Sequence, residues 1–223
     1  MSLTEKFFNT AGPQKADINY TIDPLTRINW EELRYLIDNQ RYFLLHAPRQ
    51  TGKTTALLSI VEALNAEARY TALYVNLEIA QTARNQVTLG NRTIAQAIAS
   101  AARLYLNDNR LNEWLVAQPS DIDNHHLVFA LLEYWSVVSQ PPIILLLDEV
   151  DALIGDTLVS LLRQLRAGYT QRPKAFPQSV LLCGVRDIKD YRIHQSDGEI
   201  ITGGSAFNVK AESLTMGNFS EAQ

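Results

Sequence analysis

The strongest constraint on this chain is a nine-residue segment, 47–55, that reads Ala-Pro-Arg-Gln-Thr-Gly-Lys-Thr-Thr. It directly follows the apolar run 42–45 and directly precedes Ala-Leu-Leu at 56–58, so we expect it to join a buried strand to a helix. A glycine-lysine loop in that context is typical of a phosphate-binding loop, where backbone N–H groups and the positive end of the helix dipole face the phosphates. The segment therefore predicts a nucleoside triphosphate site.

The residue types of this loop suit the chemistry of phosphate binding. Lys53 is expected to reach the outer phosphates, and the Thr54 hydroxyl is expected to bind Mg2+. The residues expected to contact the nucleotide are Pro48, Arg49, Gln50, Thr51, Gly52, Lys53, Thr54 and Thr55. Ala47 stands where the usual pattern has its first glycine, but Pro48 favours an extended conformation at that position, so a positive φ is not required there.

A second motif lies about ninety residues downstream, where the apolar run 143–147 ends in Asp148 and Glu149. A continuous apolar run of this length indicates a fully buried strand. Two carboxylates at the end of such a strand are typical of a Walker B segment, which accompanies a phosphate-binding loop. The two motifs together predict a P-loop domain.

Length, composition and net charge limit the size of the fold and the classes of protein and metal site that are possible. At 223 residues and 46% hydrophobic, the chain can bury the core of one sizeable α/β domain. The longest apolar run is far too short to cross a bilayer and the N-terminus lacks a leader pattern, so we expect a cytoplasmic protein. Cys183 is the only cysteine and the four histidines are scattered, which excludes an internal disulfide and a zinc spacing. The net charge of -4 gives no general attraction to nucleic acid, and a local basic patch is left open.

Apolar strand patterns alternate with helical patterns along the chain. We expect strands at 41–46, 70–76, 142–148, 179–185 and 206–211, and helices at 29–39, 53–68, 93–117, 125–139 and 156–167. Because each strand is apolar throughout, these elements predict an α/β fold of three layers, with a mainly parallel five-stranded sheet between helices. The polar segments 81–92 and 190–204 are expected to be surface loops.

We expect three regions. Residues 1–28 have few periodic apolar positions and predict an N-terminal arm or linker. Residues 29–216 are expected to form the P-loop domain. Residues 217–223, with Ser220 as a candidate N-cap, are expected to begin a C-terminal domain that is not contained in this sequence.

These motifs resemble those of the additional-strand P-loop ATPases, the group that includes AAA+ and STAND-like proteins and predicted bacterial AAA-like ATP-binding proteins. Three segments carry the resemblance: Pro48 to Thr55, the Asp-Glu-Val-Asp of 148–151, and the Gly-Val-Arg-Asp of 184–187, which looks like a sensor 1 region. The resemblance spans about residues 41–214. It implies a sheet order of 5-1-4-3-2, numbering the expected strands along the chain, and a helical lid or winged-helix region that this sequence lacks.

The resemblance also implies roles for site residues. Asp148 would hold Mg2+, and Glu149 would orient and activate the attacking water. Arg186 would sense the γ-phosphate, or else pair with a neighbouring carboxylate. Arg27 and residues 20–25 would lie near the adenine. The candidates for an arginine finger toward a neighbouring subunit are Arg163, Arg166 and Arg172, and the alternative for each is a solvated basic helix face.

The leading hypothesis is Mg2+-dependent ATP binding and slow hydrolysis by an ATPase core that acts as a switch for a C-terminal domain in cis. One alternative is a nucleotide-binding interaction module without hydrolysis. Another is the ATPase of a DNA-linked system, in initiation or mobile-element defence. A homo-oligomer or a protein partner is left open. A GTPase is disfavoured because no Asn-Lys-x-Asp element occurs in the sequence.

Overall fold

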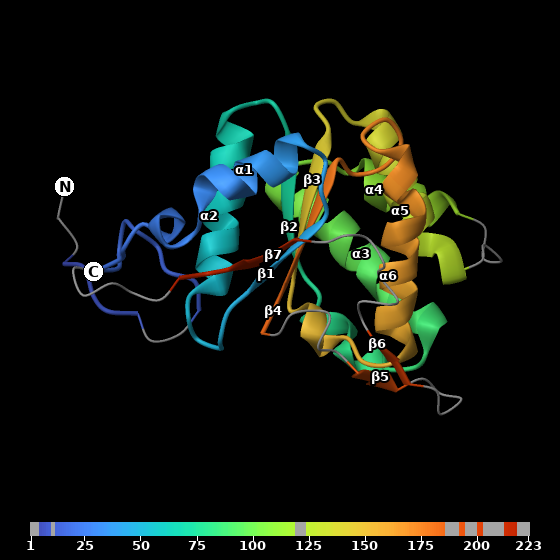
Figure 1. Cartoon of the computed structure of the whole chain (residues 1–223). Coiled ribbons are helices and arrows are strands. Elements are labelled where there is room, and N and C mark those ends of the chain that lie inside the picture. The colour runs from blue at the N-terminus through green and yellow to red at the C-terminus, as the bar shows by residue number, and fades with distance from the viewer. Residues whose placement is uncertain are drawn as a thin grey trace.

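A five-stranded parallel sheet forms the centre of the molecule (Figure 1). The computed structural model describes residues 5–9, 12–118, 124–185, 192–194, 200–202 and 212–217. The strands are β1 (Phe43–His46), β2 (Thr71–Asn76), β3 (Ile143–Asp148), β4 (Ser179–Gly184) and β7 (Glu212–Thr215), in the order β2-β3-β4-β1-β7. This confirms the expected α/β class and the expected order, with β4 inserted between the P-loop strand and the Walker B strand.

Helices cover both faces of the sheet, so the strands carry apolar residues at nearly every position. On one face lie α1 (Trp30–Asp38) and α2 (Lys53–Ala66), and on the other lie α3 (Val87–Leu106), α4 (Arg110–Ala117), α5 (Leu127–Val138) and α6 (Asp156–Gly168). The strand β3 supplies both cores by alternation: Leu145 and Leu147 pack under α3–α6, whereas Ile144 and Leu146 pack under α1 and α2.

Short 3-10 helices connect several of these elements. They are η1 (Pro24–Arg27), η2 (Glu78–Ala83), η3 (Asn124–His126), η4 (Val150–Ala152) and η5 (Tyr169–Gln171). The helix η1 belongs to the segment that precedes α1, and η4 follows β3 directly. The helix η4 therefore adjoins the carboxylates at the end of β3, and η1 lies against the loop 47–55, because Arg27 donates to Thr51 O.

The structure corrects the predicted loop at 81–92. The helix α3 begins at Val87, residues 81–83 belong to η2, and residues 84–86 connect the two. The polarity of this segment was misleading because Asn91 is fully buried and its amide donates to Asn124 O at 3.1 Å, His125 O at 3.0 Å and Ser160 Oγ at 3.0 Å. A buried amide with all these partners is compatible with a helix in the core.

The single helical segment expected at 93–117 is two helices. Asn107 takes a left-handed conformation with φ 53° and ends α3, and Asp108 Oδ1 then accepts from Arg110 N at the start of α4. The Asn-Asp-Asn run at 107–109 is a turn signal that the apolar periodicity on either side concealed.

Two further predictions, a loop at 190–204 and a strand at 206–211, concern the C-terminal part of the chain. Within the segment expected as a loop, 190–204, β5 (Arg192–His194) and β6 (Ile200–Thr202) form a separate antiparallel pair. The last strand was expected at 206–211, which lies outside the described residues, and the edge strand of the structure is β7, beginning at Glu212.

Candidate functional site

The loop between β1 and α2 is built around left-handed backbone conformations. Gly52 has φ 85° and precedes the first residue of α2, and Gln50 has φ 60°. Glycine adopts this conformation without a steric cost, which explains why it stands at position 52. Thr51 Oγ1 donates to Pro48 O at 2.7 Å across the loop. The fourteen-residue helix α2 thus begins at the loop and adds its positive dipole end there.

Lys53 lies at the centre of the loop and is 7% exposed. Its Nζ donates to Ala47 O at 3.1 Å and to Pro48 O at 3.0 Å, both carbonyls of the loop itself. Among the described residues, these two neutral carbonyl oxygens are its hydrogen-bond acceptors, so the ammonium can exchange them for an anionic partner, to which it would bond more strongly. The geometry suits a lysine that exchanges these contacts for a phosphate.

Asp148 joins the two motifs that lie far apart in the sequence. Its carboxylate is fully buried, and Oδ2 accepts from Thr54 Oγ1 at 2.9 Å and from the Tyr74 hydroxyl at 3.1 Å. Its other oxygen, Oδ1, accepts from Glu149 N at 2.9 Å. Burial, followed by the charge and hydrogen bond of Asp148, raises the pKa of Tyr74 well above its usual range, so this hydroxyl remains a donor.

Glu149 follows in a left-handed conformation with φ 55°, uncommon for a residue with a side chain. Its pKa is raised, first by burial and then by the charges of Asp148, Asp151 and Glu78, while Lys53 opposes the shift. Asp151 is tied to the end of β4, because its Oδ2 accepts from Val185 N at 3.2 Å. The turn after β3 is therefore fixed to the end of a neighbouring strand.

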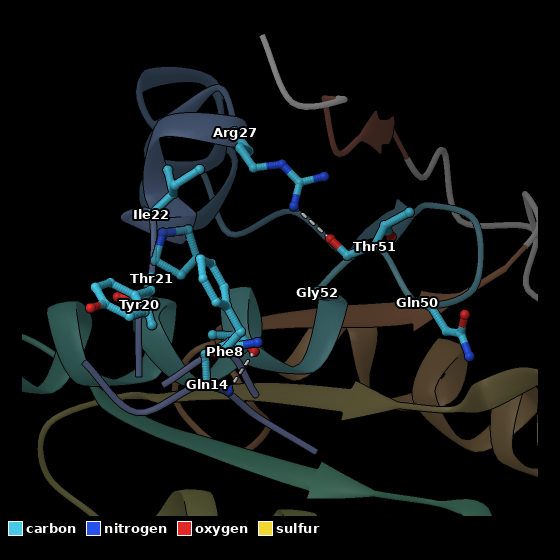
Figure 2. Close-up of a pocket in the computed structure, with 11 residues that line it drawn as sticks. Phe8, Gln14, Tyr20, Thr21, Ile22, Arg27, Gln50, Thr51 and Gly52 are labelled. Atoms are coloured by element: carbon cyan, nitrogen blue, oxygen red, sulfur yellow. Dashed lines mark hydrogen bonds between the residues drawn. The ribbon is translucent and has the colours of Figure 1, made fainter. Parts of the chain in front are cut away.

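Two adjoining cavities lie at this edge of the sheet. One, of about 480 Å³, is lined by Lys53, Thr54, Glu78, Glu149 and by loop and arm residues that include Arg49 and Pro13. The other, of about 390 Å³, lies between the arm and the loop (Figure 2). Gln50, Gly52 and Thr55 line both cavities. The first cavity has the groups for a polyphosphate, and the second continues from it.

The N-terminal arm forms the outer wall of the second cavity. Of the segment expected near the base, Tyr20, Thr21, Ile22, Pro24 and Arg27 line it, as Figure 2 shows. Phe8 and Gln14 also line it, and neither residue was expected there from the sequence. Gln14 N donates to Thr55 Oγ1 at 3.2 Å, which places the arm against the first turn of α2. No sequence pattern marks Phe8 or Gln14, since both come from a segment without periodicity.

Tyr74 is the other residue that was missed. It lies in the apolar run of β2, where an aromatic residue indicates core packing. The parallel register pairs Asn76 with Asp148, so Tyr74 stands two residues before the strand end that faces the site. Once β2 is known to lie beside β3, the position of Tyr74 near the end of β2 marks it as a candidate site residue.

The arginines that were predicted to act at the site or toward a partner differ in their exposure and contacts. Arg163 and Arg166 are exposed on α6. Arg172 is held within its own chain, where it stacks on the rings of Tyr42 and Tyr169 and donates to Gln40 O. Arg186 lies outside the described residues, so its predicted role stays a prediction.

No helix in the described part of the chain is both long enough and apolar enough to cross a membrane. No group of three or more His, Cys, Asp and Glu side chains within those residues has the geometry of a metal site. A Mg2+ ion held by one carboxylate, one hydroxyl and the phosphates of a nucleotide does not need such a group.

Comparison with known proteins bears on the fold. No protein-family model matches the sequence, and no curated protein matches it. Among solved structures, a Walker-type ATPase of Pyrococcus abyssi matches with a TM-score of 0.51 and 15% identity, covering 88% of this chain and 55% of that one. Cdc6p from Pyrobaculum aerophilum matches with a TM-score of 0.46 and 20% identity, covering 69% of this chain and 37% of that one.

The chain thus spans about half the length of the first of these structures, and the second likeness is too weak to support an argument. At 15% identity the first likeness concerns the fold alone. Together with the strand order and the loop at the end of β1, it shows that this chain has the α/β fold of the P-loop ATPases.

Proposed function

We propose that this protein is the core of an AAA+/STAND-like ATPase, which binds ATP with Mg2+ and hydrolyses it slowly to switch the position of a C-terminal domain. The observation that carries the proposal is the hydrogen bond from Thr54 to Asp148, with Lys53 and Glu149 lining the same cavity. Residues separated by about ninety positions meet there only because β1 and β3 end at the same edge of the sheet.

The donor set fits Mg2+. A hydroxyl oxygen and a fully buried carboxylate lie 2.9 Å apart, and Mg2+ prefers one or two such oxygens together with waters and substrate phosphates. Thr54 and Asp148 would hold the ion, which when bound would neutralise charge on the phosphate oxygens. Tyr74 would keep the carboxylate of Asp148 in one orientation through its hydrogen bond to Oδ2.

Glu149 would act as the base that orients the attacking water. Its carboxylate faces the phosphate cavity, and its raised pKa makes it a better proton acceptor than an ordinary glutamate. Lys53 would leave the carbonyls of Ala47 and Pro48 to bind the outer phosphates. The loop residues 50–55 would supply backbone N–H groups to the phosphates.

A path from the loop to the C-terminal part of the chain supports the switch. The Arg27 guanidinium donates to Thr51 O in the loop and to Gly217 O after β7. A movement of the loop on nucleotide binding would therefore be transmitted through Arg27 to residue 217. The C-terminal domain in cis and a cytoplasmic location are part of this proposal. A homo-oligomer using Arg163 or Arg166, or a protein partner, is left open by it. The ATPase of a DNA-linked system is an alternative.

The test is nucleotide binding and phosphate release with and without Mg2+. We expect Lys53→Ala to weaken ATP binding roughly 10- to 100-fold, because a charge-assisted contact is lost. We expect Glu149→Gln to bind ATP but to lower turnover about 100-fold or more. Lys174→Ala is a matched control, since Lys174 is exposed and does not line the cavity.

The outcomes separate the alternatives. Equal hydrolysis by the wild type and Glu149→Gln would remove Glu149 from the role of base. Tight ATP binding without turnover, both here and in a chain extended beyond residue 223, would favour the interaction module. Binding that is indifferent to Lys53→Ala would place the nucleotide elsewhere.

A further inference from the structure

A third cavity lies among the helices that cover one face of the sheet, and we call it the helix cavity. It has a volume of about 580 Å³ and is lined from the start of α3, from η3, from the first turn of α5 and from α6 (Figure 1). None of the described residues that line it also lines a cavity at the nucleotide site. Its volume lies within the usual range for ligand sites, and the proposed ATPase chemistry does not use it.

A network of buried hydrogen bonds fixes the shape of the helix cavity. Gln164 is 5% exposed, its Oε1 accepts from Phe129 N at 2.9 Å, and its Nε2 donates to Asn91 Oδ1 at 3.2 Å. Asn91 Nδ2 in turn donates to His125 O at 3.0 Å. These bonds join α3, η3, α5 and α6, so the cavity is formed before any ligand enters it.

The helix cavity is a groove with an apolar floor and an open side. Val159 and Phe129 supply the floor, the first buried and the second half-buried. On the open side, the lining residues His125, His126 and Arg163 are exposed. A ligand can therefore reach the apolar floor from solvent.

Two opposite charges line the groove along α6. Arg163 is exposed and Asp156 is half-buried, and neither forms an ion pair with another described residue. Their spacing of two helical turns, or about 10 Å, places both on one side of the helix. A ligand with one acidic and one basic group would complement both charges, whereas a polyanion would be repelled by Asp156.

The length of the groove suits a short stretch of polypeptide. The lining follows α6 from Asp156 to Ala167, which is roughly 16 Å at about 1.5 Å per helical residue. An extended chain covers that distance with about five residues, at about 3.3 Å each. Recognition of an extended peptide by pockets for its side chains is a recurrent mode of protein interaction.

Two chain segments connect the helix cavity to the phosphate cavity. The first leads from Glu78, which lines the phosphate cavity, through η2 to Val87, which lines the helix cavity. The second leads from Glu149 in the phosphate cavity through η4 to Asp156 in the helix cavity. A shift of either segment on nucleotide binding would therefore change the lining of the groove.

The two segments are also bonded to each other near both ends. Close to the phosphate cavity, Leu77 N donates to Asp148 O at 3.0 Å, and at the helix cavity Asp156 N donates to Asn85 Oδ1 at 3.1 Å. Arg84, next to Asn85, has a positive φ of 46°, which is uncommon for a residue with a side chain. Strained backbone of this kind is found at switch segments, so these connections suit a coupling between two sites.

We propose that the helix cavity binds an extended peptide segment of a protein partner, with an acidic side chain on Arg163, a basic side chain on Asp156 and apolar side chains between them. Phe129 and Val159 would contact the apolar side chains. Nucleotide binding would change the affinity for the peptide through segments 78–87 and 149–156, and peptide binding would change the affinity for the nucleotide by the same factor. The peptide site is independent of the proposed function, and only this coupling rests on it.

The experiment measures equilibrium binding of two peptides to the full chain without nucleotide. Acetyl-Glu-Leu-Phe-Leu-Lys-amide carries one charge of each sign, and acetyl-Lys-Leu-Phe-Leu-Lys-amide replaces the acidic residue. The wild type should bind the first peptide about five- to tenfold more tightly, the range for one hydrogen-bonded charge pair. Absence of binding up to about 1 mM peptide, or equal affinity for both peptides, would overturn the inference.

A charge reversal tests whether Arg163 makes the contact. Arg163→Glu should reverse the preference, so that the peptide with two lysines binds more tightly, and Arg163→Ala should remove the preference. The matched control is Arg166→Glu, since Arg166 is exposed on the same helix but does not line the cavity. It should retain the preference of the wild type. The same reversal in Arg166→Glu would mean that the overall charge of α6 decides, and would contradict the site.

A second set of measurements tests the coupling and separates it from the proposed function. Peptide affinity should differ at least about fivefold between the chain without nucleotide and the chain with Mg2+ and a non-hydrolysable ATP analogue. Bound nucleotide without any change in peptide affinity would overturn the coupling. Peptide binding by a chain that binds no nucleotide would contradict the proposed function and leave the peptide site intact. ATP hydrolysis by a chain that binds neither peptide would do the reverse.

Discussion

At the scale of single residues, Glu149 combines two unfavourable features. Its backbone is left-handed, and its carboxyl lies among the carboxylates of Asp148, Asp151 and Glu78. Strained conformations and crowded like charges cost stability and persist where the surrounding structure holds them in place. Here the hydrogen bonds of Asp148 and Asp151 hold the turn.

The raised pKa of Glu149 predicts a stability effect that depends on pH. The folded chain binds the proton of Glu149 more tightly than the unfolded chain, so ionisation of this group lowers the stability of the folded state. That cost is absent below the ordinary glutamate pKa of 4.5 and is complete once the pH exceeds the raised value. Glu149→Gln should therefore raise the melting temperature by up to about 2 °C at pH 8 and by less at pH 4.

The measurement is the difference in melting temperature between the variant and the wild type across this pH range. Glu67→Gln, with a carboxylate that contacts Arg34 away from the site, provides a comparison. A difference for Glu149→Gln that is the same at pH 4 and pH 8 would show that ionisation is not its cause.

At the scale of secondary-structure elements, α3 and α6 approach each other closely at Gly90. A Cβ atom at Gly90 would lie 2.5 Å from Thr157 Oγ1, in the first turn of α6. Thr157 is fully buried. Glycine at position 90 is therefore required by packing, although it costs helix propensity within α3.

Gly90→Ala should destabilise the protein by about 1–3 kcal/mol, because the added methyl group cannot be accommodated without moving one helix. The free energy of unfolding in urea gives the effect. In the double variant Gly90→Ala with Thr157→Ala, part of the loss should be recovered, since the smaller side chain leaves room for the methyl group. Strictly additive losses would show that the two positions do not conflict.

At the scale of the whole molecule, one guanidinium joins three distant segments. Arg27 is 9% exposed and donates to Thr51 O at 2.6 Å and, through Nη2 and Nε, to Gly217 O at 2.8 and 3.1 Å. In return, Gly217 N donates to Arg27 O at 2.8 Å. Burial lowers the pKa of Arg27 from its very high ordinary value, but such a group remains charged.

Arg27→Ala should therefore lower the free energy of unfolding by about 1–3 kcal/mol, since it removes the charged donor of the Thr51 and Gly217 carbonyls. Arg27→Lys should recover less than half of the loss, because an ammonium cannot reproduce the planar fork. The control is Arg166→Ala on the exposed face of α6, expected within about 0.5 kcal/mol of the wild type. Full recovery by Arg27→Lys would mean that charge, rather than the fork, is what matters.

The sequence by itself determined the fold class and the two motifs of the site, whereas the strand order was expected only from the family resemblance. These features are encoded in neighbouring residues: a glycine that tolerates φ 85°, an apolar run ending in two carboxylates, and strands apolar on both faces. Local conformational preference and burial produce a periodic pattern of apolar residues, and helices and strands can be predicted from that pattern. Where a buried polar residue interrupts the pattern, as Asn91 does in α3, the predicted structure was wrong: a loop was expected where α3 begins.

Only the tertiary structure decided which distant residues meet. The contacts of Asp148 with Thr54 and Tyr74 depend on strand order and register, and the contact of Gln14 with Thr55 depends on how the arm crosses the loop. The same holds for the link from Arg27 to Gly217. Such contacts leave no periodic trace in the sequence, because each is made by a single side chain whose partner is set by the packing of the whole chain.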